Sequence, residues 1–177
     1  HYSRETAELR RIRSAILDVL TTIQDAETGQ RGYLLTRRLD YLAPYRDALQ
    51  TLAEKRARLA TSVQDKPIYS GKIPVLQAAL DAKIAEIGRT IELVDAGRVE
   101  EAINIVRADT GLLYMRTIRD TLDEFQEITD DRLRIIVNDQ LQAADNLRWV
   151  TIGGAIAIIA VVGGALFLIA KYVGELM

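Results

Sequence analysis

The sequence of 177 residues has no cysteine, three prolines and one histidine, which is residue 1. Without cysteine the chain has no disulfide, no thiol nucleophile and no thiolate metal site. A lone histidine at the first position also removes most metal and general-base chemistry. The carboxylates are scattered among basic residues, and no nucleophile–base pair can be named. We therefore expect a protein that is not an enzyme and that uses no metal and no cofactor.

Charge of a single sign is also lacking. The 23 Lys and Arg residues nearly balance the 25 Asp and Glu residues, giving a net charge of −2, and the two signs are interleaved along the chain. A nucleic-acid-binding protein would instead carry a basic patch or stripe. What the chain does contain is mainly Ala, Leu, Ile, Arg, Glu and Asp, a composition typical of a helical protein. We expect no nucleic-acid partner.

Four stretches of the chain repeat apolar residues at alternating spacings of three and four, as on the buried face of an amphipathic helix. In residues 1–37 these are Leu9, Ile12, Ile16, Val19, Ile23, Ala26, Gln30 and Tyr33. In residues 41–64 they are Leu42, Tyr45, Leu49, Leu52, Leu59 and Val63, with Arg56 at the missing position. In the third stretch they are Leu76, Leu80, Ile84, Ile87, Ile91 and Val94. The fourth has Met115, Ile118, Leu122, Phe125 and Ile128, followed by Leu133, Ile136, Leu141, Ala144 and Leu147.

Turn-forming residues separate the stretches. We expect a turn at residues 37–39, with Asp40 as the N-cap of the second helix. The run QDKPIYSGKIP, with two prolines and a glycine, predicts a loop before a third helix that starts near Pro74 and stops at Gly97. A short helix in RVEEAINIVRAD and a turn at residues 109–111 then lead into one last helix.

One uncharged segment, Trp149 to Ala170, reads WVTIGGAIAIIAVVGGALFLIA. A helix of this length spans roughly 33 Å, enough to cross the hydrocarbon core of a bilayer. Charged residues bracket it, and Trp149 and Tyr172 stand where interfacial aromatic residues are common. A buried core helix is the other interpretation, but it needs a large soluble protein around it. We expect a transmembrane helix at 149–172, after a helical domain at 1–148 and before the start of a cytoplasmic segment at 173–177.

Because short connections make consecutive helices antiparallel, the predicted fold is all-α: an up-down-up-down four-helix bundle whose last helix, 112–172, continues into the membrane. Within the membrane segment, small residues at spacings of four, three and four form one face on which another helix can pack. These residues are Gly153, Ala157, Ala160 and Gly164. They predict a homodimer or another membrane-helix partner. The alternative is that Gly and Ala are simply common in membrane helices.

The run DAETGQRGYLLT, residues 25–36, places two glycines inside the first helix, where each costs about 1 kcal/mol. Gly29 and Gly32 fall on nearly the same face, which permits either the close approach of another helix or a local kink. Glu27 and Arg31 are four residues apart in the favourable order for a helical ion pair. Six residues form the candidate site: Glu27, Thr28, Gly29, Arg31, Gly32 and Tyr33. Two interpretations stay open, a ligand or signal-input site and a structural cap that joins helices.

Two polar seam residues, Gln30 and Arg56, also have two interpretations. Each could form a polar layer that fixes the register of the helices, or could contact a polar ligand.

Together with the run YLAPYRDAL, this motif resembles the third type of cyclase/histidine-kinase-associated sensory extracellular (CHASE) domain. The matching residues are Glu27, Thr28, Gly29, Arg31, Gly32, Tyr33 and Leu34, then Tyr41, Leu42, Pro44 and Tyr45. The resemblance covers roughly residues 10–145. It implies an extracytoplasmic sensor module between two transmembrane helices, of the kind found on bacterial histidine kinases, cyclases and chemoreceptor-like proteins. It identifies no ligand.

Two functional hypotheses follow. In the first, the chain is a sensor in the inner membrane of a bacterium, with its bundle in the periplasm or outside and its C-terminus in the cytoplasm. A small molecule or protein changes the packing of the bundle or its dimer, and the last helix passes the change across the lipid bilayer. In the second, the chain is a membrane-anchored helical accessory or structural subunit of a larger membrane complex.

Overall fold

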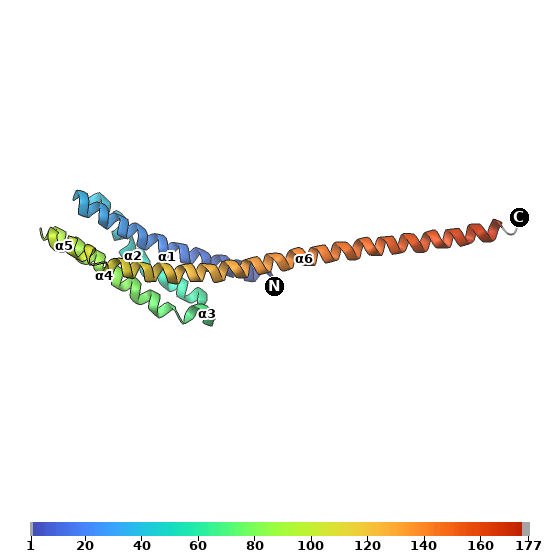
Figure 1. The fold of residues 1–177 in the computed structure, drawn as a ribbon, viewed down its shortest axis with the longest axis horizontal. Helices are drawn as coiled ribbons and strands as arrows, with labels where there is room; N and C mark the ends of the chain where they lie inside the picture. Colours follow the sequence, from blue (N-terminus) through green and yellow to red (C-terminus); the bar gives the residue numbers. More distant parts are fainter. Residues whose placement is uncertain (1, 175–177) are drawn as a thin grey trace. The chain divides into compact units, whose positions relative to one another are not determined.

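The computed structural model describes the backbone of residues 2–174, and the side chains of residues 4–138 and of a few positions between 149 and 164. All secondary-structure elements of the described backbone are helices, and it contains no strand (Figure 1). The elements are α1 (Tyr2–Thr36), the 3-10 helix η1 (Leu39–Leu42), α2 (Ala43–Val63), α3 (Pro67–Ser70), α4 (Ile73–Asp95), α5 (Val99–Arg107) and α6 (Thr110–Gly174). The all-α prediction is confirmed, and the helices begin and end within a few residues of the predicted positions.

Gly97 ends α4 as predicted. Its φ is 76°, in the left-handed region that glycine adopts without strain. Its N–H donates to the carbonyl of Val94 at 3.0 Å, and the N–H of Arg98 donates to that of Leu93 at 2.7 Å. These two bonds form a Schellman motif, which satisfies carbonyls that the end of the helix would otherwise leave unpaired.

Two details at the start of α2 and before α4 differ from the prediction. Asp40 does not cap α2: no side chain caps this helix, and the Asp40 carboxylate bonds to the Arg38 guanidinium instead. The chain makes an extra 3-10 turn, η1, before α2 begins at Ala43. The predicted loop before α4 also contains one short helix, α3, with Pro67 in its first turn.

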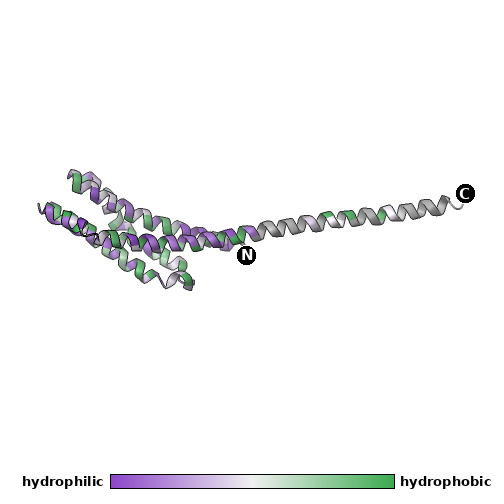
Figure 2. Cartoon of the chain, viewed as in Figure 1, coloured by the Kyte–Doolittle hydropathy of each residue, from purple (hydrophilic) through white to green (hydrophobic). Residues whose placement is uncertain are grey.

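The core of residues 1–133, the first of two compact units of the chain, consists of the predicted seams. All eight seam residues of α1 are buried. On α2 the prediction is wrong at one position: Leu49 is exposed, and the smaller Ala48 is buried in its place. Figure 2 shows hydrophilic and hydrophobic residues alternating along these helices, as amphipathic helices require.

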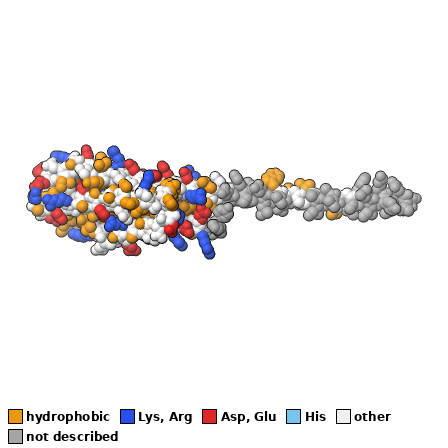
Figure 3. Space-filling model, turned by 90° about the horizontal axis from the view of Figure 1, so that it is seen from below, with side chains coloured by type: hydrophobic (Ala, Val, Ile, Leu, Met, Phe, Trp, Pro, Cys, Tyr) orange, Lys and Arg blue, Asp and Glu red, His pale blue; other side chains and the backbone are white. Residues whose placement is uncertain are grey.

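Side-chain pairs give the direction of the helices within this unit. Asp18 on α1 pairs with Arg58 on α2, and one turn later on α1 Thr22 accepts a hydrogen bond from Lys55, which comes earlier on α2. Helix α2 therefore runs opposite to α1. Lys72, the residue just before α4, pairs with Glu124 on α6, so the beginning of α4 lies beside α6. On the face drawn in Figure 3, acidic and basic side chains are interspersed, in agreement with the sequence.

The second unit, residues 134–177, contains the rest of α6, which ends at Gly174. Among the residues described there, Trp149 and Ile156 are exposed. No helix in the described part of the chain has an apolar stretch long enough to span a bilayer. Most side chains of the predicted transmembrane helix, 149–172, lie outside the described residues.

The predicted small-residue face can be compared with the structure at two of its four positions. Gly153 and Gly164 are exposed, and a Cβ atom added to either would meet nothing within 4 Å. The side chains of Ala157 and Ala160 lie outside the described residues. The helix partner predicted for this face stays a prediction.

Candidate functional site

The two glycines of the candidate motif allow η1 and the first turn of α2 to pack closely against α1. A Cβ atom added to Gly29 would clash with the backbone carbonyl oxygen of Tyr41 and touch the ring of Pro44 at 3.5 Å. A Cβ atom added to Gly32 would clash with the aromatic ring of Tyr41. Helix α1 runs through both positions without interruption. Of the two interpretations, close approach is therefore the one that the structure supports.

The second run of the resemblance packs in the same way against α4. The hydroxyl group of Tyr45 lies against Gly88 of α4. A Cβ atom added to this glycine would be only 2.8 Å from the hydroxyl oxygen. Burial, and then the charge of Glu92, raise the pKa of Tyr45 above its usual value. Tyr41 and Tyr45 thus place the beginning of α2 on glycines of two different helices.

Glu27 lies at the centre of a buried charge cluster that joins α1 to α4. Its Oε1 atom is 2.8 Å from Nζ of Lys83, and the same Nζ is 2.7 Å from Oε2 of Glu86. The side chains of Lys83, Glu27 and Glu86 are only 3%, 9% and 8% exposed. Arg31 approaches Oε1 of Glu27 to 3.2 Å from the surface. A buried carboxylate or ammonium group requires such partners, because the transfer of an unpaired charged group out of water has a large free-energy cost.

Two more polar pairs extend this contact toward the ends of α1 and α4. The amide of Gln30 donates to the hydroxyl of Thr90, and both side chains are buried. The hydroxyl of Tyr33 donates to a carboxylate oxygen of Asp95. This hydrogen bond and burial raise the pKa of Tyr33. We call these three pairs, Glu27–Lys83, Gln30–Thr90 and Tyr33–Asp95, the α1–α4 polar ladder.

The six predicted site residues therefore separate into two groups. Glu27, Gly29 and Tyr33 are buried, and Gly32 is partly buried under the ring of Tyr41. Thr28 and Arg31 are exposed. The structure brings the first group into helix–helix contacts.

The two polar seam residues have different roles. Gln30 forms the predicted polar layer. Arg56 is only partly buried and pairs with Asp81 on α4, so it belongs to the edge of the bundle.

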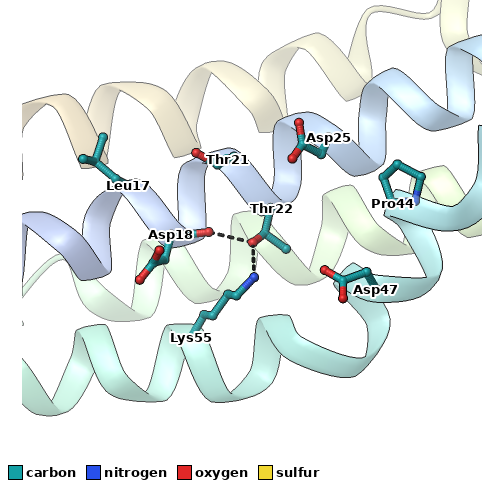
Figure 4. A pocket seen from close by; sticks show the side chains of 8 residues that line it. All are labelled: Leu17, Asp18, Thr21, Thr22, Asp25, Pro44, Asp47 and Lys55. Carbon is teal, nitrogen blue, oxygen red and sulfur yellow. Dashed lines mark hydrogen bonds between the residues drawn. The ribbon is translucent and has the colours of Figure 1, made fainter.

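Two adjoining pockets lie between α1 and the beginning of α2. The first, of about 220 Å³, is lined by Leu17, Asp18, Thr21, Thr22, Asp25, Pro44, Asp47 and Lys55 (Figure 4). Figure 4 shows Nζ of Lys55 donating to the Thr22 hydroxyl, which in turn donates to the carbonyl of Asp18. The second pocket, of about 210 Å³, is lined by Asp25, Thr28, Gly29, Asp40, Tyr41 and Pro44. Thr28 thus connects the motif to a hollow on the surface.

Neither pocket has the ligands of a metal site. In the part of the chain that the structure describes, no three His, Cys, Asp or Glu side chains are grouped so that they could hold a metal ion. The carboxylates nearest the pockets are partly used by neighbours, since Asp18 pairs with Arg58 and Asp40 with Arg38. The pair with Arg38 lowers the pKa of Asp40.

The residues that sequence reasoning missed are Lys83, Glu86 and Gly111. A Cβ atom on Gly111 would come within 2.6 Å of Oε2 of Glu86, so the cluster reaches the first turn of α6. The signal in the sequence was weak: Lys83 and Glu86 are three residues apart, a spacing that is also usual for an ion pair on the exposed face of a helix.

Comparisons with known proteins bear on the family and the fold of the chain. The sequence matches the family of CHASE3 domains over residues 2–138. Among solved structures, the sensor domain of the histidine kinase HK9 from Rhodopseudomonas palustris is similar, with 27% sequence identity and a TM-score of 0.62. The match covers 71% of this chain and 98% of that domain. A comparison with curated protein sequences gave no match.

Proposed function

The chain belongs to the CHASE3 domain family, and we propose on this basis that it is the extracytoplasmic sensor module of a bacterial transmembrane receptor. The receptor would be of the histidine kinase, cyclase or chemoreceptor type. The observation that carries the proposal is the family match over residues 2–138, together with the similarity to nearly all of a histidine kinase sensor domain. No catalytic step is assigned to the chain itself.

We further propose that α1, α2, α4 and the first part of α6 form an up-down-up-down four-helix bundle. The opposite directions of α1 and α2 support this topology. So do two contacts at α4 and α6, Lys72 with Glu124 and Glu86 with Gly111, whose order along the two helices is antiparallel. A signal, a small molecule or a protein, would change the packing at the end of the bundle that contains the candidate motif. Small shifts of packed helices suffice to switch a downstream element that has two states.

The exit for the signal would be α6, which belongs to both compact units. We propose that its residues 149–172 cross the inner membrane, on the basis of the uncharged segment 149–170 in the sequence. The bundle would then lie in the periplasm or outside, and residues 173–177 would begin the cytoplasmic part. The small-residue face of this segment would pack against a second copy or another membrane helix.

For the candidate motif, we propose a signalling role in which its buried members hold α1 to α4 and to the beginning of α2. Glu27, Gly29, Gly32 and Tyr33 support this, because each makes a contact with another helix or with Tyr41. Thr28 and Arg31, which face solvent, would be the members available to a ligand.

Cysteine labelling in intact cells tests the orientation. The chain has no cysteine of its own, so each introduced cysteine gives a single signal. Asp65→Cys, at an exposed position next to α2, should react with a membrane-impermeant thiol reagent, and Gly174→Cys should react only after the cells are opened. The reverse pattern, or equal labelling of both, would contradict the proposed orientation.

The complete coding sequence tests the receptor proposal itself. A kinase, cyclase or chemoreceptor signalling domain after residue 177 would support it. A coding sequence that stops there, in a protein that purifies with a larger membrane complex, would support an accessory subunit instead.

A further inference from the structure

The buried charge cluster described above is larger than the motif needs for joining α1 to α4. Lys83 alone would neutralise Glu27, yet it also contacts Glu86 at 2.7 Å. The Glu86 carboxylate lies directly against the backbone of Gly111, in the first turn of α6. The cluster therefore connects three helices that are far apart in the sequence.

Gly111 is the residue that allows this contact. An added Cβ atom would lie 2.6 Å from Oε2, 2.8 Å from Cδ and 2.9 Å from Oε1 of Glu86. The carboxylate is usually the mobile end of a glutamate side chain. Here it is 8% exposed and held by Lys83, so it has little freedom to move aside.

We propose that Glu27, Lys83 and Glu86 form a joint that fixes the first turn of α6 to the α1–α4 core, so that a change at the motif on α1 is passed to α6. Glu27 is then a positioning residue, which acts on α6 through Lys83 and Glu86. This inference rests on the proposed sensor function only for its biological meaning. The joint itself is a property of the folded chain.

Electrostatics explains why the joint would respond as a unit. Removing one partner of a buried salt bridge is strongly unfavourable, because it leaves a buried charge without full compensation. Neutralising Glu27 leaves Lys83 with Glu86 as its remaining carboxylate partner in the cluster. The ammonium group then loses its charged partner on α1, and the Glu86 carboxylate that rests on Gly111 loses its connection to α1 with it.

Hydrogen–deuterium exchange of the full chain in detergent micelles tests the joint. Glu27→Gln should raise the exchange rates of the amides in the second and third turns of α6, near residues 114–120, by about tenfold or more at neutral pH. The matched control is Asp18→Asn, which also turns a carboxylate on α1 into an amide but breaks an exposed ion pair with Arg58. This control should leave these rates unchanged.

A double variant separates transmission through Glu86 from general loosening. In a Glu86→Ala background, where no carboxylate rests on Gly111, Glu27→Gln should have less than half of its effect on α6. Gly111→Ala should raise the same rates in the natural background and do so much less in the Glu86→Ala background.

A failure of the joint can be distinguished from a failure of the proposed signalling role. If Glu27→Gln changes exchange only in α1 and α4, or changes α6 equally with and without Glu86, the joint is wrong whatever the protein senses. If the exchange results appear as expected but Glu27→Gln leaves the output of the complete receptor unaltered, the joint stands and the proposed signalling role of the motif is contradicted.

Discussion

The aromatic ring of Tyr41, in the 3-10 helix between α1 and α2, lies directly on Gly32 of α1. No side chain larger than hydrogen fits at this glycine unless the ring moves. We expect Gly32→Ala to lower the free energy of unfolding by about 1–3 kcal/mol, because overpacking outweighs the helix propensity of alanine. Tyr41→Ala in the same chain should remove most of this loss, which urea unfolding of single and double variants measures.

The neighbouring glycine provides a sharper comparison. At Gly29 the clash is with the backbone oxygen of Tyr41, which no substitution of Tyr41 removes. Gly29→Ala should therefore destabilise the chain by a similar amount, about 1–3 kcal/mol, with or without Tyr41→Ala. Gly71→Ala is the control, because Gly71 has a helical φ of −63° and its new Cβ atom would meet only one atom, at 3.9 Å. A Gly29→Ala chain as stable as this control would contradict the packing described for the motif.

Lys83 is the second position where a large effect is expected. Lys83→Met keeps much of the side-chain volume but leaves Glu27 and Glu86 buried without their shared cation. We expect a loss of about 3–5 kcal/mol in the free energy of unfolding at neutral pH. A triple variant that also carries Glu27→Gln and Glu86→Gln should regain most of it. If Lys83→Met alone is as stable as the natural chain, the three charges are not buried together.

Alkaline pH should weaken the contact between Tyr33 and Asp95. The hydrogen bond and burial raise the pKa of Tyr33, so the folded state favours the neutral phenol. The stabilisation is therefore complete below the pKa of about 10 of the unfolded chain and is lost as the pH rises through the higher folded value. Tyr33→Phe should be less stable at pH 7 and should lose less stability between neutral and alkaline pH.

The measurement is thermal unfolding of both chains at several pH values, with Tyr114→Phe as a control for tyrosine ionisation in general. Equal alkaline slopes for the natural chain and Tyr33→Phe would show that this phenol does not gain stability from its folded surroundings.

The continuity of α6 provides a prediction for the complete receptor. Ala144→Pro should remove a backbone hydrogen bond and bend or break the helix, at about 3 kcal/mol or more. The output should stop responding to the signal while residues 1–133 still unfold cooperatively. Gln142→Lys, two residues away, should change the response little. A normal response in the proline variant, with the bundle intact, would mean that the signal does not travel through a continuous α6.

The sequence predicted the helices well because their burial follows a local period. Every seam residue of α1 is buried, since spacings of three and four place them on one face whatever lies opposite. The wrong predictions concern residues whose burial or hydrogen bonding depends on which neighbouring residue they meet. Ala48 rather than Leu49 is buried on α2, and Asp40 bonds to Arg38 instead of capping a helix.

For the candidate site, the sequence could predict that two glycines on one face permit close approach, but not that Tyr41 is what approaches. Lys83 was missed for a related reason. A lysine is ordinarily exposed. The burial of Lys83 depends on two carboxylates, and that of Glu27 lies on a helix that is not its neighbour in the chain. Partners of this kind are set by tertiary packing, which no local pattern encodes.

The α1–α4 polar ladder also bears on the order in which the chain folds. Its hydrogen bonds join residues 60 and 62 positions apart on helices that run in the same direction, so they form only after the chain has turned back along α2 and turned again into α4. The entropy of closing so long a loop delays such contacts relative to the nearby pairing of α1 with α2. Once formed, they favour one alignment, because a shift of one helical turn would separate Lys83 from Glu27 and leave each buried charge with one partner fewer. The ladder therefore acts late, rejecting compact arrangements in which the helices have met in the wrong register.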